Sequence, residues 1–245
     1  MVAAEQSGRW QLPAVIRPPA KPTPNFGGDQ LWSVACQRPA YCVAVGEYNV
    51  TANSSQLVQR PMMTTESAGR WLPAQGLSAP GDVASIPNAP GVGRLDSAGL
   101  HSVSCAPQGP CLAAGAYLAV PAQGPAAKPQ IRSLAISELN GRWSAPQELP
   151  PGFGAASACT IPYCLIAESG AGPISPGTAV SYAGGRWSRA AAINPPADAS
   201  RSTGPRPGYL LQIAGVVCFS DGRCIAAGSY IDKSNRREPM VAIRS

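Results

Sequence analysis

Two residues of this sequence have side chains suited to acid–base chemistry at one site. The chain has a single histidine, His101, and Glu168 stands where other copies of a repeated motif have Gly46, Gly115 and Gly228. An imidazole and a carboxylate that lie together at one edge of the fold can transfer protons to and from a substrate. Glu168 and His101 are therefore the candidate catalytic pair. The alternative is that Glu168 only marks a repeat that has drifted in sequence.

Trp32 and three acidic residues are the candidates for contacts with a ligand. Trp32 stands four positions before a cysteine, as His101 does, and the acidic residues are Glu47, Asp29 and Asp96. These residues stand at the starts and ends of expected strands, which places them near the same edge of the fold as His101. We predict that they line a ligand site there, and the alternative for Trp32 is ordinary packing.

The eight cysteines form four closely spaced pairs, which favours disulfides over metal binding. The pairs are Cys36 with Cys42, Cys105 with Cys111, Cys159 with Cys164, and Cys218 with Cys224. A hairpin of this length brings two antiparallel strands close enough for a cross-strand disulfide, whereas a zinc site would need CxxC-type knuckles. The sequence also has no nucleophile elbow, HExxH motif, phosphate-binding glycine loop or calcium loop. We therefore expect no metal and no cofactor.

The elements that must position these residues repeat four times. A Gly-Arg-Trp motif precedes the first cysteine pair and follows each of the first three pairs, at Gly8–Trp10, Gly69–Trp71, Gly141–Trp143 and Gly185–Trp187. Each unit reads as four short antiparallel strands, with the cysteines at the first hairpin and the tryptophan on the last strand. The repeats cover approximately 31–74, 100–148, 154–190 and 213–245 plus 5–16. We expect the four tryptophans to pack between units, with a row of sugar platforms as the alternative.

The two ends of the sequence predict how the units are arranged. The last unit stops after its third strand, and the chain begins with EQSGRW, which reads as a fourth strand. We therefore predict an all-β fold, a four-bladed β-propeller with four-stranded antiparallel blades, as a single domain over 1–245. The ring is closed by the N-terminal strand, which completes the last blade. A linear solenoid would instead have atypical capping repeats.

The units resemble the repeats of secreted actinobacterial proteins in which SVSC-x5-C-x-A-x-G-x-Y is followed by a strand, a turn and a tryptophan. In this chain the phrase reads LHSVSCAPQGPCLAAGAY at 100–117, and the resemblance covers nearly the whole sequence. It implies an extracellular β-propeller. It implies no particular activity, because the family has no common one.

Composition agrees with short strands in an oxidising compartment. Gly and Pro number 26 and 27, and only 13% of the residues are charged, which favours turns over long helices. The net charge of +6 is spread without a run of like charge, so we expect a solvated surface rather than nucleic-acid binding. Eight paired cysteines predict a secreted protein. The start MVAA has no signal-peptide pattern, which fits a mature form or, as the alternative, a cytoplasmic protein. No apolar run reaches the roughly 18 residues of a membrane span, and we expect a monomer.

The long connections of unequal length all fall on one face of the predicted propeller. Function concentrates in such loops on a rigid scaffold. We therefore predict a secreted, non-catalytic propeller that binds a glycan, a protein or a small molecule at the long-loop face. The alternative is an enzyme, a lyase, a cyclase or a glycoside-processing enzyme, with Glu168 and His101 at the mouth of the central channel.

Overall fold

The computed structural model describes residues 1–3, 5–6, 8–20, 28–53, 56–78, 96–119, 130–139, 141–149, 153–170, 176–200 and 211–244. Within these ranges the regular structure consists of β-strands, and no helix is long and apolar enough to span a membrane. The all-β class predicted from the sequence is confirmed. The long connections of the sequence analysis fall largely outside the described residues.

The strands group into four units that follow the cysteine repeat. The first unit contains β3 (Gln30–Arg38), β4 (Tyr41–Asn53), β5 (Gln56–Ser67), β6 (Arg70–Trp71) and β7 (Gln75–Gly76). The second contains β8 (Asp96–Cys105), β9 (Cys111–Ala119), β10 (Gln130–Leu139), β11 (Arg142–Trp143) and β12 (Gln147–Leu149). The third contains β13 (Phe153–Cys159), β14 (Tyr163–Ser169), β15 (Gly177–Ala183), β16 (Arg186–Trp187) and β17 (Ala191–Ile193). The fourth contains β18 (Leu211–Cys218), β19 (Cys224–Ile231) and β20 (Arg237–Arg244).

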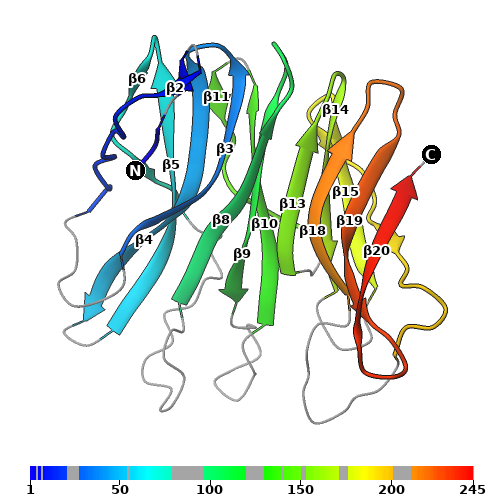
Figure 1. The fold of residues 1–245 in the computed structure, drawn as a ribbon. Coiled ribbons are helices and arrows are strands. Elements are labelled where there is room, and N and C mark those ends of the chain that lie inside the picture. The colour runs from blue at the N-terminus through cyan, green and yellow to red at the C-terminus, as the bar shows by residue number, and fades with distance from the viewer. Residues whose placement is uncertain are drawn as a thin grey trace.

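Each unit is an antiparallel meander, and the units stand side by side (Figure 1). The first two units share one ten-stranded sheet, because β5 pairs in parallel with β8. The third unit forms a five-stranded sheet and the fourth a three-stranded sheet. The third strand of each of the first three units pairs with two short strands, one at the tryptophan and one a few residues later. This second short strand was not expected from the sequence.

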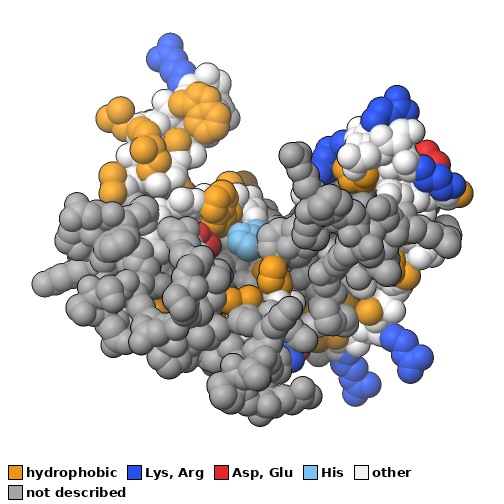
Figure 2. Space-filling view, turned by 90° about the horizontal axis from the view of Figure 1, so that it is seen from below, with side chains coloured by type: hydrophobic (Ala, Val, Ile, Leu, Met, Phe, Trp, Pro, Cys, Tyr) orange, Lys and Arg blue, Asp and Glu red, His pale blue; other side chains and the backbone are white. Residues whose placement is uncertain are grey.

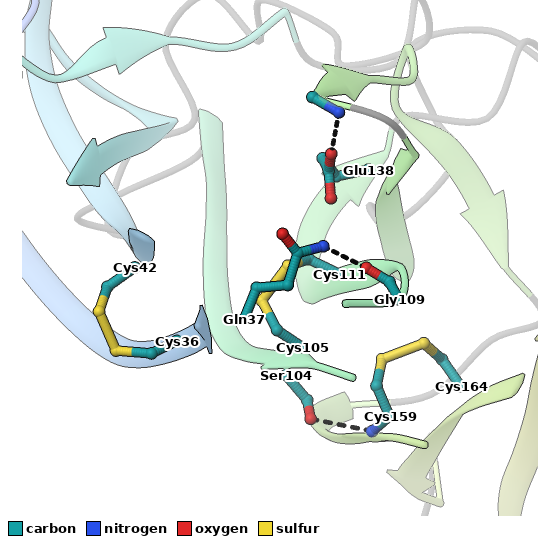
Figure 3. Close-up of a disulfide and its surroundings, with 11 residues drawn as sticks. Cys36, Gln37, Cys42, Ser104, Cys105, Gly109, Cys111, Glu138, Cys159 and Cys164 are labelled. Atoms are coloured by element: carbon teal, nitrogen blue, oxygen red, sulfur yellow. Dashed lines mark hydrogen bonds between the residues drawn. A yellow bond between two sulfur atoms is a disulfide. The ribbon is translucent and has the colours of Figure 1, made fainter. Parts of the chain in front are cut away.

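The four disulfides join the cysteines as predicted. They are Cys36–Cys42, Cys105–Cys111, Cys159–Cys164 and Cys218–Cys224, and in each pair the two residues lie directly opposite one another in the ladder. Three of them lie at neighbouring hairpins in Figure 3, where the Gln37 side chain donates to the Gly109 carbonyl and Cys159 N donates to Ser104 Oγ at 2.9 Å. Four disulfides are consistent with an extracellular protein.

Apolar cores fill the spaces between successive units. One cluster joins Val43 and Val45 to Leu100 and Tyr117, with Trp143 packed against it. A second lies between units two and three, with Trp187 packed against it, and a third between units three and four. The expected packing of tryptophans between units is thus confirmed for Trp143 and Trp187.

The predicted closure of the ring by the N-terminal strand is wrong in this structure. β2 (Arg9–Trp10) pairs with β1 (Glu5–Gln6) in a separate two-stranded sheet, and β20 pairs with β19 alone among the described strands. The two chain ends lie on opposite sides of the fold in Figure 1. Glu5 stands opposite Trp10, just as Glu138 of the third strand stands opposite Trp143 in unit two. A hairpin partner a few residues away has a smaller loop-closure cost than a partner at the far end of the chain.

A bulge in the first strand of three units explains the glycine of the repeated motif. In β3, β8 and β18 the register shifts by one residue just where the strand faces Gly46, Gly115 and Gly228. At this point a Cβ on Gly115 would lie 1.8 Å from the carbonyl oxygen of Gly99, and the other two glycines meet a backbone oxygen equally closely. The glycines are therefore required by the approach of one strand's backbone to the next.

This requirement predicts a large loss of stability for Gly115→Ala. The clash is with backbone atoms, so relief requires strand displacement, and we expect the free energy of unfolding to fall by about 3 kcal/mol or more. Urea unfolding measures this change. Gly215→Ala is the matched control, because a Cβ there meets nothing within 4 Å, and it should change the midpoint little. Equal effects of the two substitutions would contradict the close approach.

Candidate functional site

The bulges place Trp32 and His101 at equivalent points of β3 and β8, the first strands of two neighbouring units. In β3 the register passes from Leu31 to Ser33, so Trp32 has no residue opposite it. In β8 the register passes from Leu100 to Ser102, so His101 has no residue opposite it either. A bulge turns the extra residue away from the regular alternation of side chains and often occurs beside functional sites. The shared spacing to the following cysteine, seen in the sequence, is therefore the mark of a shared bulge.

The two aromatic rings contact one another at the surface. The ring centroids of Trp32 and His101 are 6.3 Å apart, with the planes at 76°, an edge-on arrangement. Trp32 is 52% exposed, whereas His101 is half-buried. Partial burial lowers the pKa of His101 below its usual value and so favours the neutral imidazole. Figure 2 looks onto this end of the strands and shows the histidine next to an acidic side chain and to hydrophobic side chains.

Glu47 is the carboxylate that approaches the same glycine as His101. A Cβ atom at Gly99 would lie 2.5 Å from Glu47 Oε2 and 3.2 Å from His101 Nε2, so the two side chains approach the same glycine. Glu47 lies on β4, opposite Gln30 of β3, and its Oε1 accepts a hydrogen bond from Gln59 Nε2. The absence of a side chain at Gly99 leaves room there for both the carboxylate and the imidazole.

The two remaining acidic candidates have different positions. Asp29 Oδ1 accepts a hydrogen bond from the backbone N–H of Asn49 at 3.0 Å, so this carboxylate holds the start of β3 against β4. Asp96 pairs through its backbone with Val58, and its side chain lies outside the described residues. Asp29 thus borders the site as an anchor of the strands that carry it.

The predicted pairing of Glu168 with His101 is not present. Glu168 is completely buried on β14, and its Oε2 accepts a hydrogen bond from Thr178 Oγ1 at 3.0 Å. Burial raises the pKa of Glu168 to about 7, although hydrogen bonds from Ser133 and Thr178 oppose the rise. No hydrogen bond or ring contact joins it to His101 within the described part of the chain. Glu168 points into the core between units two and three, because it shares a strand face with Cys164 and Ile166.

A shifted bulge explains why unit three tolerates a side chain at position 168. In β13 the register changes between Phe153 and Ala155, one residue pair further from the disulfide than in the other units. Glu168 therefore faces Ala155 in regular register, where a Cβ has room. The closer spacing of Cys159 and Cys164 concerns the hairpin loop, so no residue pattern in the sequence marks this shift.

Sequence reasoning found Trp32, His101 and Glu47 but missed how they combine. Gln59 and Gly99 were not singled out, and no motif marks either of them. Both follow from the placement of β5 and β8 side by side, which is a contact between different units. No group of three or more His, Cys, Asp or Glu side chains that could hold a metal ion occurs in the described ranges.

Comparisons with known proteins find similarity of structure only. No family model matches the chain, and no curated protein matches it in sequence. One similar solved structure concerns the GH130 family of mannoside phosphorylases, described as containing glycoside hydrolases that target β-1,2-mannosidic linkages in Candida mannan. The match has 9% identity and a TM-score of 0.44, over 94% of this chain and 74% of that one.

Two further solved structures are similar to a comparable degree. An α-L-arabinofuranosidase from Podospora anserina, in complex with cellotriose, has 10% identity and a TM-score of 0.39, over 93% of this chain and 68% of that one. A putative glycosidase from Bacteroides thetaiotaomicron has 10% identity and a TM-score of 0.41, over 88% and 69%. At these values the likeness is one of β-rich architecture.

These findings correct the main functional prediction. The sequence analysis gave a non-catalytic ligand-binding propeller, whereas the proteins just named are described as glycoside hydrolases and glycosidases. The physical basis for an enzyme in this chain must come from its own residues. The candidate residues are His101, Glu47 and the exposed Trp32.

The buried carboxyl of Glu168 predicts a stability that falls as pH rises. Its pKa is about 7 in the folded protein and about 4.5 when unfolded. Below pH 4.5 both states are protonated, between the two values only the unfolded state ionises, and above 7 the full cost of about 3 kcal/mol is reached. Glu168→Gln should remove this loss. The measurement is urea unfolding at pH 5 and pH 8.

The half-buried Glu66 provides the matched control for that measurement. Glu66→Gln should leave the difference between pH 5 and pH 8 as it is in the unmodified protein. An unchanged difference in Glu168→Gln would instead show that Glu168 ionises normally in the folded state, and would contradict its burial in the apolar core.

Proposed function

We propose that this protein is a secreted glycoside-processing enzyme. Its site is formed by Trp32, Glu47 and His101, where the bulged starts of β3 and β8 meet. The observation that carries the proposal is that an exposed indole ring contacts an imidazole, and that a carboxylate approaches the same glycine, Gly99, as this imidazole. The four disulfides support an extracellular location.

The scaffold that we propose for this site is a four-bladed β-propeller in which each unit is one blade. Four equivalent units support this reading, as do the apolar cores and tryptophans between successive units. Side-chain hydrogen bonds also link neighbouring units: Val103 N donates to Ser33 Oγ at 3.1 Å, and Ile213 N donates to Ser169 Oγ at 2.9 Å. In such a scaffold the bulged strand starts converge at the mouth of the channel.

The nature of the side chains favours a sugar as substrate. Indole is a large apolar surface on which the C–H face of a sugar ring can stack, while the polar groups beside it can bind hydroxyls. Glu47 and Gln59 supply an acceptor and donors within reach of a ring placed over Trp32 and His101. Orientation would come from these polar groups and affinity from the indole.

The proton chemistry of the proposed reaction requires one base that is neutral at the start. His101 takes a proton from water as the water oxygen attacks the anomeric carbon on the same face as the departing glycosidic oxygen, so that one imidazole reaches both oxygens. The resulting imidazolium returns that proton to the departing glycosidic oxygen, so protons balance over the turnover. Glu47 stabilises the transient positive charge on the imidazole and fixes its orientation. General acid–base catalysis of this kind contributes roughly 10²–10⁴-fold to the rate.

Assays of product release from a panel of oligosaccharides and polysaccharides test the proposal. We expect His101→Asn to lower kcat by about 100-fold or more while sugar binding is retained. Trp32→Ala should raise KM about tenfold and change kcat little, because it removes stacking from substrate and transition state alike. Phe219→Ala is the control, since Phe219 is an exposed aromatic residue of the Cys218–Cys224 hairpin, at the opposite strand end. Full activity of His101→Asn would refute the assigned role.

A second variant tests the geometry rather than the groups themselves. Gly99→Ala would put a methyl group between Glu47 and His101, where only the ends of flexible side chains must move. The fold should therefore be kept, with kcat reduced about tenfold or more. Circular dichroism checks the fold and the same product assay measures kcat. An unchanged kcat would show that the carboxylate and the imidazole do not act together.

A further inference from the structure

The fourth unit has no short tryptophan strand paired with its third strand among the described residues, whereas the other three units have one. In units one to three the tryptophan of the Gly-Arg-Trp motif stands opposite a residue of the third strand: Trp71 opposite Glu66, Trp143 opposite Glu138, and Trp187 opposite Tyr182. In units two and three this residue also faces the second cysteine. In unit four Arg244 faces Cys224, and β20 has no strand on its other edge among the described residues. The neighbouring Val241 and Ile243 on β20 are 65% and 71% exposed.

A cavity lies where the tryptophan of unit four would pack. It has a volume of about 620 Å³ and lies between β14, β15 and β17 on one side and β19 and β20 on the other. Its lining includes Leu165, Ala167, Ala179, Ile193, Cys224 and Ala226. By register these correspond one for one to the core residues of the preceding interface, Leu112, Ala114, Ala135, Leu149, Cys164 and Ile166.

The preceding interface shows what fills such a space. Trp187 packs against that core, and its Nε1–H donates to Gln147 Oε1 on β12. The position of Gln147 corresponds to Ala191 on β17, since they stand opposite Ala135 and Ala179 respectively. Ala191 also lines the cavity. The cavity is thus the tryptophan pocket of the repeat, without its tryptophan.

The chain carries a tryptophan strand that is not packed. Trp10 on β2 is 75% exposed, and Leu12 and Val15, which follow it, are 94% and 89% exposed. Backbone hydrogen bonds between Val2 and Ala14 close this segment on itself, and Ala74 N of unit one donates to Arg17 O at 2.9 Å. Figure 1 shows the N-terminal end on one side of the fold and β20 on the other.

We propose that the β20 edge and its cavity bind the tryptophan hairpin of a second copy of this chain. Trp10 of one molecule enters the cavity of the next, and β2 adds to β20 with Trp10 opposite Arg244. Within its own molecule Trp10 stands opposite Glu5 of the two-residue strand β1. Docking therefore replaces β1 by β20 as the strand that pairs with β2. The other occupant, the molecule's own hairpin, would have to leave its contacts on unit one.

The geometry of the proposed contact is head to tail. Each molecule has one hairpin to donate and one edge to accept, and these are different surfaces, so the contact is heterologous and joins further copies unless a ring closes. Addition of a strand to an exposed edge also covers the open backbone groups of β20. The proposal departs from the monomer expected from the sequence and is independent of the proposed activity.

Sedimentation velocity over a concentration series tests the proposal, with two complementary variants. Trp10→Ala removes the donated side chain, and Ala191→Trp fills the cavity from an exposed position of β17. We expect the unmodified protein to form dimers and larger species as concentration rises, and each variant alone to require at least 100-fold higher concentration. An equimolar mixture of the variants should form dimers only, because it retains one intact hairpin and one intact cavity. Phe219→Ala should behave as the unmodified protein.

Two outcomes would overturn the proposal. A protein that stays monomeric with Trp10 accessible to a collisional fluorescence quencher has an empty cavity in solution. A protein that stays monomeric with Trp10 protected from the quencher has docked its own hairpin, which is closure within one chain. Comparison with Trp10→Phe isolates the fluorescence of Trp10, and urea unfolding of each variant confirms that it is folded.

Discussion

The approach of one strand's backbone to the next at Gly46, Gly115 and Gly228 is the constraint on which the rest of this structure depends. A side chain at any of these positions would overlap a carbonyl oxygen, so the first strand of the unit can bulge there only while the second strand has glycine. The bulge in turn expels one residue from the alternation of the strand. In units one and two that residue is Trp32 and His101, respectively. The candidate site exists because both bulges lie at the same register position of the repeat.

The apolar interfaces between units fix which polar groups are available for chemistry. Val43 and Val45 of β4 face unit two, so Glu47, two residues further along the same strand, faces it as well and approaches Gly99 of β8. Glu168 follows Cys164 and Ile166 on a face that is fully covered, and its carboxyl is kept from solvent. Two carboxylates at nearly the same place in the repeat thus differ in accessibility because their strand faces meet different neighbours.

Much of the fold could be predicted from residue spacing, and the parts that failed share a physical reason. The disulfides and meanders depend on neighbours in the chain, and the cysteine spacing predicted them. The position of Trp32 and His101 followed from their distance to the next cysteine. Ring closure failed because Glu5 offers Trp10 a local partner. The pairing of Glu168 with His101 failed because a one-residue shift of the β13 bulge is hidden from the sequence, as is the contact that brings Gly99 beside Glu47.

The parallel pairing of β5 with β8 has a consequence for how this chain can evolve. Val58 pairs with Asp96 and Gln59 with Ser97, so the first two units are one continuous sheet, whereas units three and four form sheets of their own. Duplication, loss or exchange of a repeat is tolerated where units meet only through side chains. Between units one and two it would cut a backbone ladder and separate Glu47 from His101. Recombination can therefore vary the later repeats, while the first two are inherited together as the part that holds the candidate site.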